Sequence, residues 1–240
     1  FQFDSTATTS TKDELASLVS TTISNYNTTD LQDFNNVFRH SKLLRLIDET
    51  DSSILNNTTT VTMGKFFTAV AGASSYNINF NNAFFNPHSG HNADAGGVIA
   101  STGFYLDNDL TTEYFFDDDG AGNLRIYSLS SAGVRTYLNS AAGTVDYVNG
   151  TISIGTLNIT AVSNVDGASS TKIRVTVIPK SNDVVPVRNQ LLEIDLVNST
   201  ISGSVDAQAT TGKGYTVTST GTTTTTSVTT TSSTPTSSAY

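Results

Sequence analysis

Three potential metal ligands lie close together in the segment NPHSGHNADAGG at positions 86–97. His88 and His91 are separated by two residues, and Asp94 follows after two more. Imidazole and carboxylate groups are ligands of divalent metals, so a tight loop could place all three on one ion and support a metal-dependent hydrolase. The usual helical zinc motif needs two histidines four residues apart, and the proline and glycines of this segment oppose a helix. The alternative is a loop that packs against a partner, and we expect no bound metal and no other cofactor.

A second group of candidates is acidic, and a pair of its carboxylates could act as acid and base in glycoside hydrolysis. The stretch DDDGAGN at 117–123 also resembles a calcium loop, but an EF-hand needs Gly at the sixth position and Glu at the twelfth. Here Gly120 is fourth and Ser128 is twelfth. We therefore predict a turn between two strands and solvated acids. The group comprises Asp107, Asp109, Glu113, Asp117, Asp118 and Asp119.

The most charged candidate segment is FRHSKLLRLIDETDSSI at 38–54, in which His40 precedes Ser41. A catalytic histidine would need a nucleophile and an orienting acid, whereas Ser41 stands where a helix cap is expected. We predict an amphipathic helix over 41–49 whose apolar side chains face inward. Its Arg45 would pair with Asp48 or Glu49. The outward residues Lys42, Arg45 and Glu49 are candidate partner contacts, and we predict no catalytic residue and no enzymatic activity.

The elements that must position these groups change in character along the chain. Thr11 and Glu14 have the spacing of a capping box, and apolar residues then recur at helical intervals as far as Tyr26. Strands are predicted at the start of the chain, over 33–38 and over 58–66, around helices at 11–26 and 41–49. Together they predict a small β-α-β-α-β domain over 1–68.

Beyond this point, alternation of apolar and polar residues predicts a larger antiparallel, all-β domain over 69–209, so the fold class is α+β. A long loop is expected near 71–97, and Asn149-Gly150 is predicted to form a two-residue hairpin turn. A Thr- and Ser-rich low-complexity tail occupies 210–240. The predicted strands are 76–80, 97–106, 113–116, 124–129, 150–162, 172–178 and 191–196.

Composition excludes several classes of function. The formal net charge of −9 disfavours a nucleic-acid partner, because duplex binding needs a basic surface. The sequence contains no apolar run of about 18 residues, so we expect no membrane insertion. Without cysteine there is neither a disulfide nor a thiolate metal site. The chain opens on FQFDST without an initiator methionine, and we expect it to be a fragment of a longer protein.

The segment NYNTTDLQDFNNVFRHSKLLRLIDETDSSILNNTTTVTM, which begins at Asn25, resembles the C-terminal half of the large baseplate wedge protein of T4-like contractile-tailed phages, the J-like family. The stretches YFFDDDGAGNLRIYSL and KIRVTVIPKSNDVVPVRNQLLEID are similar to the β-rich extension of marine T4-like relatives. The Thr-rich tail is not part of the resemblance. The matching positions are Tyr26, Asp30, Phe34, Asn35, Phe38, Ser41, Lys42, Leu43, Asp48, Asp51, Ser53 and Met63, with apolar exchanges at Ile47, Ile54 and Val61.

The resemblance implies a structural virion protein of the tail baseplate, assembled in the host cytoplasm, with no catalytic residues. Its C-terminal region would form a homodimer, would join wedges into a ring and would bind other wedge proteins. We expect a symmetric dimer that buries at least about 1,000 Å². Two alternatives stay open: a carbohydrate-binding or adhesin-like β module, which the absence of tryptophan disfavours, and the metal-dependent hydrolase.

Overall fold

The structure is a computed structural model that describes residues 1–91, 97–164, 170–187 and 190–206. The chain divides into two compact units, each built from separate stretches of sequence. The first, which we call the helical unit, contains residues 1–25, 41–58 and, among the described residues, 199–206. The second, the barrel unit, contains residues 26–40 and the described part of 59–198. No helix in the described ranges is long and apolar enough to cross a membrane.

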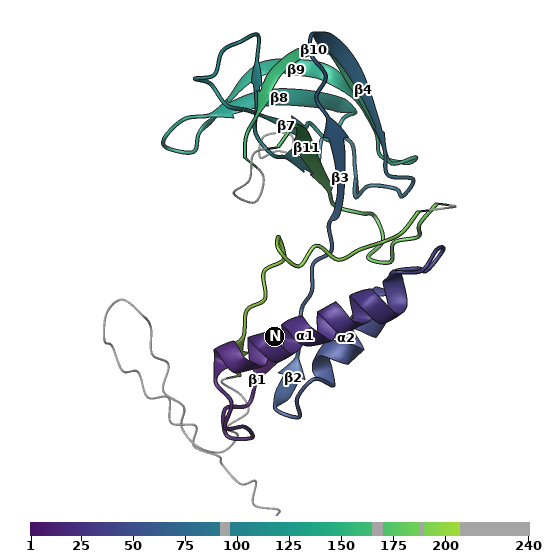
Figure 1. The fold of residues 1–240 in the computed structure, drawn as a ribbon, viewed down its shortest axis with the longest axis vertical. Coiled ribbons are helices and arrows are strands. Elements are labelled where there is room, and N and C mark those ends of the chain that lie inside the picture. Colours follow the sequence, from purple (N-terminus) through teal and green to yellow (C-terminus); the bar gives the residue numbers. More distant parts are fainter. Residues whose placement is uncertain (92–96, 165–169, 188–189, 207–240) are drawn as a thin grey trace, which may run out of the picture. The chain divides into compact units, whose positions relative to one another are not determined.

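The helical unit is organised around two helices, α1 (Lys12–Tyr26) and α2 (His40–Asp48), whose end residues Tyr26 and His40 belong to the barrel unit. The predicted capping box of α1 is confirmed: Glu14 accepts the Thr11 N–H at 2.7 Å, and the Glu14 N–H donates to the Thr11 hydroxyl at 3.3 Å. Figure 1 shows α1 and α2 running close to one another, and the Thr50 hydroxyl just beyond α2 donates to the Thr22 hydroxyl of α1 at 2.9 Å.

A three-stranded sheet completes the helical unit, in the order β12-β1-β2. Strand β1 (Gln2–Phe3) pairs antiparallel with β2 (Ile54–Asn56) and parallel with β12 (Ser204–Val205). The buried side chains of Phe3 and Ile54 stand at paired positions in this sheet. The last described residues of the chain therefore return to pair with its first strand, an arrangement that no local pattern predicts.

The strand predicted over 33–38 does not form, so the β-α-β-α-β order is not the observed one. Instead, α1 continues into a π-helical turn, η1 (Asn27–Leu31), and only Phe38 makes an isolated bridge, with Val184. The buried side chain of Asn27 explains the turn, because its Oδ1 accepts the Ile194 N–H at 2.8 Å and thus ties it to the chain far along the sequence.

The barrel unit contains a closed ring of five antiparallel strands, because β10 pairs with both β6 and β9. These strands are β6 (Phe104–Leu106), β7 (Tyr114–Asp118), β8 (Asn123–Leu129), β9 (Arg135–Asp146) and β10 (Thr151–Val162). The edge strand β4 (Ala73–Asn79) adds to β10, and Figure 1 shows β4, β8, β9 and β10 as curved strands of this unit. The core includes Phe104 and Phe116, whose rings stack at 4.5 Å, together with Leu124, Ile126, Ile152, Ile154 and Ile159.

A second sheet of the barrel unit has the order β3-β11-β5, from β3 (Met63–Thr68), β11 (Lys172–Val177) and β5 (Ile99–Ser101). It buries Ile173, Val175 and Val177 of β11. The described chain is thus mostly β with a few helices, as the α+β class requires. The low-complexity segment 210–240 lies outside the described residues.

Three predictions for the β region were wrong. Strand β9 had not been predicted, whereas 191–196 had been and forms no strand. The loop between β9 and β10 has four residues rather than two. Only Gly150 of the Asn149-Gly150 pair has a positive φ, of 66°, and the Asp146 carboxylate accepts the N–H groups of Val148 and Asn149. This aspartate, rather than an Asn-Gly turn, sets the loop conformation.

Candidate assembly surfaces

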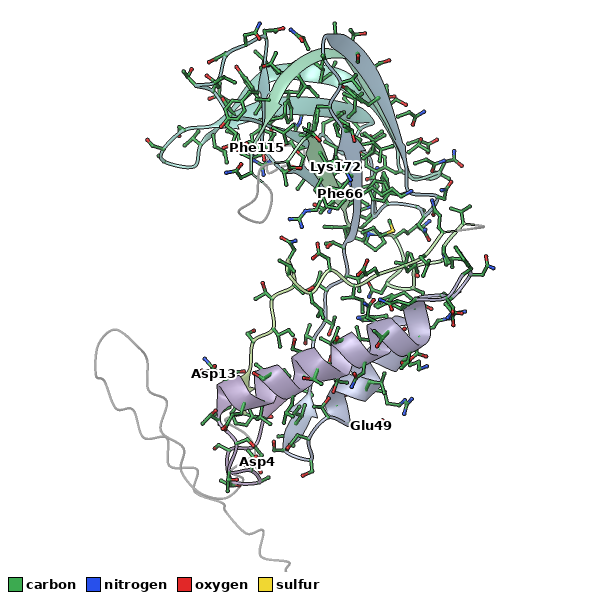
Figure 2. The ribbon with its side chains drawn as sticks, viewed as in Figure 1. Asp4, Asp13, Glu49, Phe66, Phe115 and Lys172 are labelled. Carbon is green, nitrogen blue, oxygen red and sulfur yellow. The ribbon has the colours of Figure 1, made fainter. Side chains whose placement is uncertain are left out.

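Arg45 on the outward face of α2 forms an ion pair with Glu49, the residue directly after the helix. One guanidinium nitrogen of Arg45 lies 3.0 Å from both carboxylate oxygens of Glu49, and the two side chains are 59% and 57% exposed. Leu43 and Ile47 on the opposite side are buried. An exposed pair one helical turn apart contributes only about 0.3–0.5 kcal/mol to folding, so both charges remain accessible to a partner. Figure 2 labels Glu49 in the helical unit.

The acidic residue at the end of α2, Asp48, is used locally. Asp48 accepts the side-chain amide of Asn57 at 2.7 Å, and the same amide donates to the Leu44 carbonyl at 2.9 Å. Of the two acids expected to pair with Arg45, the structure therefore selects Glu49. Lys42 is partly exposed on α2.

The start of α2 differs from the expected cap. The helix begins at His40, so Ser41 lies inside it. The backbone N–H of His40 donates to Asp183 at 2.9 Å, and Arg39 donates to the other oxygen of Asp183 at 2.8 Å. These two bonds hold the pKa of the Asp183 carboxyl below its ordinary value, the bond from Arg39 having the larger effect. The group that caps α2, the Asp183 carboxylate, therefore comes from far along the chain. The His40 ring lies 3.1 Å from the Thr59 carbonyl, so its Nε2 contacts a backbone oxygen and not a nucleophile.

Of the three expected metal ligands, the structure brings His88 and His91 together. Nδ1 of His91 lies 3.3 Å from Nε2 of His88, and the two rings are nearly perpendicular. Asp94 lies outside the described residues, so a site that includes it stays a prediction. Among the described residues, no group of three or more histidine, aspartate or glutamate side chains is arranged to hold a metal ion.

Two of the clustered acids are buried and fully engaged. Asp117 accepts hydrogen bonds from Arg125 at 2.9 and 3.2 Å, from Arg135 at 2.8 Å and from the Tyr137 hydroxyl at 3.0 Å. Asp117 and Arg125 are directly opposite one another on β7 and β8. A buried carboxylate held by two arginines is an ionic anchor between strands and not an accessible acid or base.

Asp118, the next residue, anchors a different set of groups. It accepts the Ile99 N–H at 2.9 Å, the Gly120 N–H at 3.3 Å and the Tyr147 hydroxyl at 2.6 Å. Burial raises the pKa of Tyr147, and its bond to the carboxylate raises it further. Asp118 thus links β7 to β5 and to the loop after β9.

The other acids of the group stabilise turns and neighbouring strands. Asp119 accepts the N–H groups of Ala121 and Asn123 in the predicted β7–β8 turn, which is confirmed. Asp107 accepts the Asn158 amide, Asp109 accepts the Thr111 N–H and hydroxyl, and Glu113 accepts the Ser163 hydroxyl. The structure therefore gives each of the six acids a local bonding role.

A cluster of arginine and aromatic side chains, which we call the Arg–Tyr face, consists of Phe115, Arg125, Tyr127, Arg135 and Tyr137 on β7, β8 and β9. Arg125 lies 4.3 Å from the Tyr137 ring centre, and Arg135 lies 4.6 Å from that of Tyr127. The rings of Phe115 and Tyr127 stack at 5.7 Å.

These side chains alternate along their strands with the core residues Phe116 and Ile126, so they occupy the outer side of the barrel. Arg125 and Tyr127 are buried and the other three side chains are half-buried, so this face is a packed cluster of the barrel unit rather than an open surface. Sequence reasoning missed it because β9 was missed. Figure 2 labels Phe115 in the barrel unit.

The geometry thus offers an exposed ion pair at α2 and carboxylates with structural roles in the barrel unit. Residues 2–65 match the family model described as baseplate structural protein gp6, C-terminal domain III. The match bears out the resemblance to a C-terminal baseplate wedge fragment of a T4-like phage, and it places the protein in the virion tail baseplate in a structural role. It begins in β1, includes both helices and ends at Lys65 within β3. No curated protein matches the chain.

Proposed function

We propose that this chain is a non-enzymatic subunit of a contractile-tail baseplate wedge, whose C-terminal region forms a homodimer and contacts other wedge proteins. The match of residues 2–65 to a baseplate structural domain carries the proposal. The proposed partners are a second copy of the chain and other baseplate wedge proteins, with neither nucleic acid nor membrane insertion. Lys42, Arg45 and Glu49 are the proposed contact residues, and a marine T4-like phage is the proposed source.

The α2 ion pair suits a symmetric interface. In a two-fold dimer, residue i of one protomer contacts residue j of its partner, and j contacts i in return. An Arg45–Glu49 pair can therefore exchange its internal contact for two equivalent contacts across the axis. Because the internal pair is exposed, breaking it costs little, and both side chains are presented on a helix whose opposite face is buried.

The charge arrangement gives a direct test by sedimentation of four samples: the unsubstituted chain, R45E, E49R, and an equimolar mixture of the two variants. Each single variant presents like charges across the proposed axis, and its dimer should dissociate at least about tenfold more readily, since like-charge contacts cost more than 1.4 kcal/mol. In the mixture, an all-acidic face meets an all-basic one, so a heterodimer should form. Circular dichroism should show both variants folded.

Two results would count against the proposal. A monomeric unsubstituted chain at high concentration would remove the dimer itself. If the single variants dimerise as tightly as the unsubstituted chain, or if the mixture gains nothing over them, then α2 does not lie at the axis as proposed.

A further inference from the structure

The loop after β4 presents two imidazole nitrogens that face one another. Nδ1 of His91 and Nε2 of His88 are 3.3 Å apart, and the ring planes meet at 84°. Two histidines bound to a tetrahedral zinc ion through bonds of about 2.0–2.1 Å have their nitrogens about 3.3–3.4 Å apart. The pair thus already has the separation that two zinc ligands need.

The neighbouring groups orient both rings for this role. Nδ1 of His88 lies 3.3 Å from the Ser89 carbonyl, and an N–H donated to that oxygen leaves the Nε2 lone pair directed at His91. Metal-bound histidines are held in the same way, by a hydrogen bond from the nitrogen that does not bind the ion. The rings of His91 and Phe85 pack nearly perpendicular to one another with 5.5 Å between their centres, and this contact holds the second imidazole.

The backbone that carries the two rings is held by the turn between β7 and β8. The His91 N–H donates to the His88 carbonyl at 3.2 Å, and the Gly90 N–H donates to the Gly120 carbonyl at 3.0 Å. The Asn86 side-chain amide donates to the same Gly120 oxygen at 3.1 Å. A Cβ at Gly120 would lie 2.3 Å from the His91 carbonyl oxygen, so this close approach requires glycine.

We propose that His88 and His91 form a two-histidine binding site for a divalent late transition metal ion, with Zn²⁺ as the geometric fit. The ion lies to one side of the line that joins the two nitrogens, about 2.0–2.1 Å from each, the rings turn slightly to direct their lone pairs at it, and the Nδ1 proton of His91 moves to its Nε2. The two other positions of the tetrahedron are open to water. The sequence contains no cysteine and only three histidines, so this pair brings together two of the three imidazole groups in the chain. The site does not depend on the baseplate role.

The test uses the full 240-residue chain, titrated with zinc chloride. Calorimetry gives the affinity, and long-range ¹H–¹⁵N spectra of the imidazoles report each histidine separately. We expect one ion per chain, shifted signals for His88 and His91, and an unshifted signal for His40, whose ring lies against the Thr59 carbonyl. Without zinc, His88 should be the Nδ1–H tautomer.

Two variants remove one ligand each while keeping the fold. His88 is exposed, so H88A should fold normally, and H91F keeps an aromatic ring against Phe85 without a ligand nitrogen. Each variant should weaken zinc binding at least about tenfold. Loss of a residue that only supports a metal ligand already weakens metal binding by about 10–100-fold, and here a ligand itself is removed. Unshifted imidazole signals on zinc addition, or unchanged affinity in H88A and H91F, would overturn the proposal.

Discussion

Replacing Asp117 with alanine tests whether this carboxylate is an ionic anchor of the barrel. The Asp117 side chain is 2% exposed, and it accepts hydrogen bonds from Arg125, Arg135 and Tyr137. Without the carboxylate, the Arg125 guanidinium keeps its charge and its bond to the Asp118 backbone carbonyl but loses its two bonds to Asp117, and its side chain is only 9% exposed. Leaving a buried charge without its ion-pair partner costs about 3–5 kcal/mol, whereas the more exposed Arg135 can turn toward water.

Urea unfolding monitored by near-ultraviolet circular dichroism measures this loss, since tyrosines lie within the cluster and the chain contains no tryptophan. With a slope of about 2 kcal/mol per molar urea, the midpoint should fall by about 1.5–2.5 M. D117N keeps one acceptor oxygen but no charge, so its urea midpoint should lie between those of D117A and the unsubstituted chain. D33A removes an equal charge from an exposed site of the same unit and should change stability by less than about 0.5 kcal/mol.

A double-mutant cycle separates the ion pair from general damage. R125A leaves Asp117 with Arg135 and Tyr137, so it should cost less than D117A, and the double variant should cost less than the sum by about 0.5–3 kcal/mol. If D117A lowers the urea midpoint no more than D33A does, or if the two substitutions are additive, the assignment of Asp117 as an anchor is refuted.

Two further substitutions test the barrel closure and the start of α2. A Cβ at Gly143 would lie 2.1 Å from the Ser153 carbonyl oxygen where β9 meets β10, so G143A should lower stability by about 1–3 kcal/mol in thermal unfolding. G64A meets nothing nearer than 3.9 Å and should be tolerated; equal effects of the two would contradict this reasoning. The bonds from Arg39 and from the His40 N–H lower the pKa of Asp183 in the folded protein. The stabilising effect of Asp183 is therefore complete above the ordinary carboxyl pKa of about 3.9, and it disappears as the pH falls through the lowered pKa. The difference in melting temperature between D183N and the unsubstituted chain should therefore be constant near neutral pH and should shrink under strongly acidic conditions, and a difference independent of pH would argue against this role.

Features encoded within a few residues were predicted well from the sequence. The Thr11–Glu14 capping box and the amphipathic pattern of α2 depend on contacts one helical turn apart, and both helices formed within one residue of the predicted bounds. Strands with alternating patterns, such as β8 and β11, were likewise found. The division into domains at 1–68, 69–209 and 210–240 stays a prediction.

Features set by distant contacts were missed for physical reasons. Strand β9 contains small and polar residues, and much of it is exposed, so its apolar alternation is weak. The cap of α2 comes from Asp183, which lies 143 residues beyond His40. The roles of the acids followed the same rule: Asp119 could be assigned to a turn, whereas the burial of Asp117 depends on Arg125 and Arg135 from two other strands.

The segment that matches a baseplate domain makes contacts with residues that follow it far along the chain. Its first strand, β1, takes its parallel partner β12 from residues 204–205, far outside the match at 2–65. Within the matched range, Asn27, Phe38 and Arg39 bond to Ile194, Val184 and Asp183 respectively. A fragment ending at residue 65 would lose all of these contacts: β1 would keep β2 but lose β12, and the side chain of Asn27 would lose the Ile194 N–H. The proposed dimer should therefore be measured on the whole chain, because the start of α2 is held by Asp183, which follows the barrel strands in the sequence.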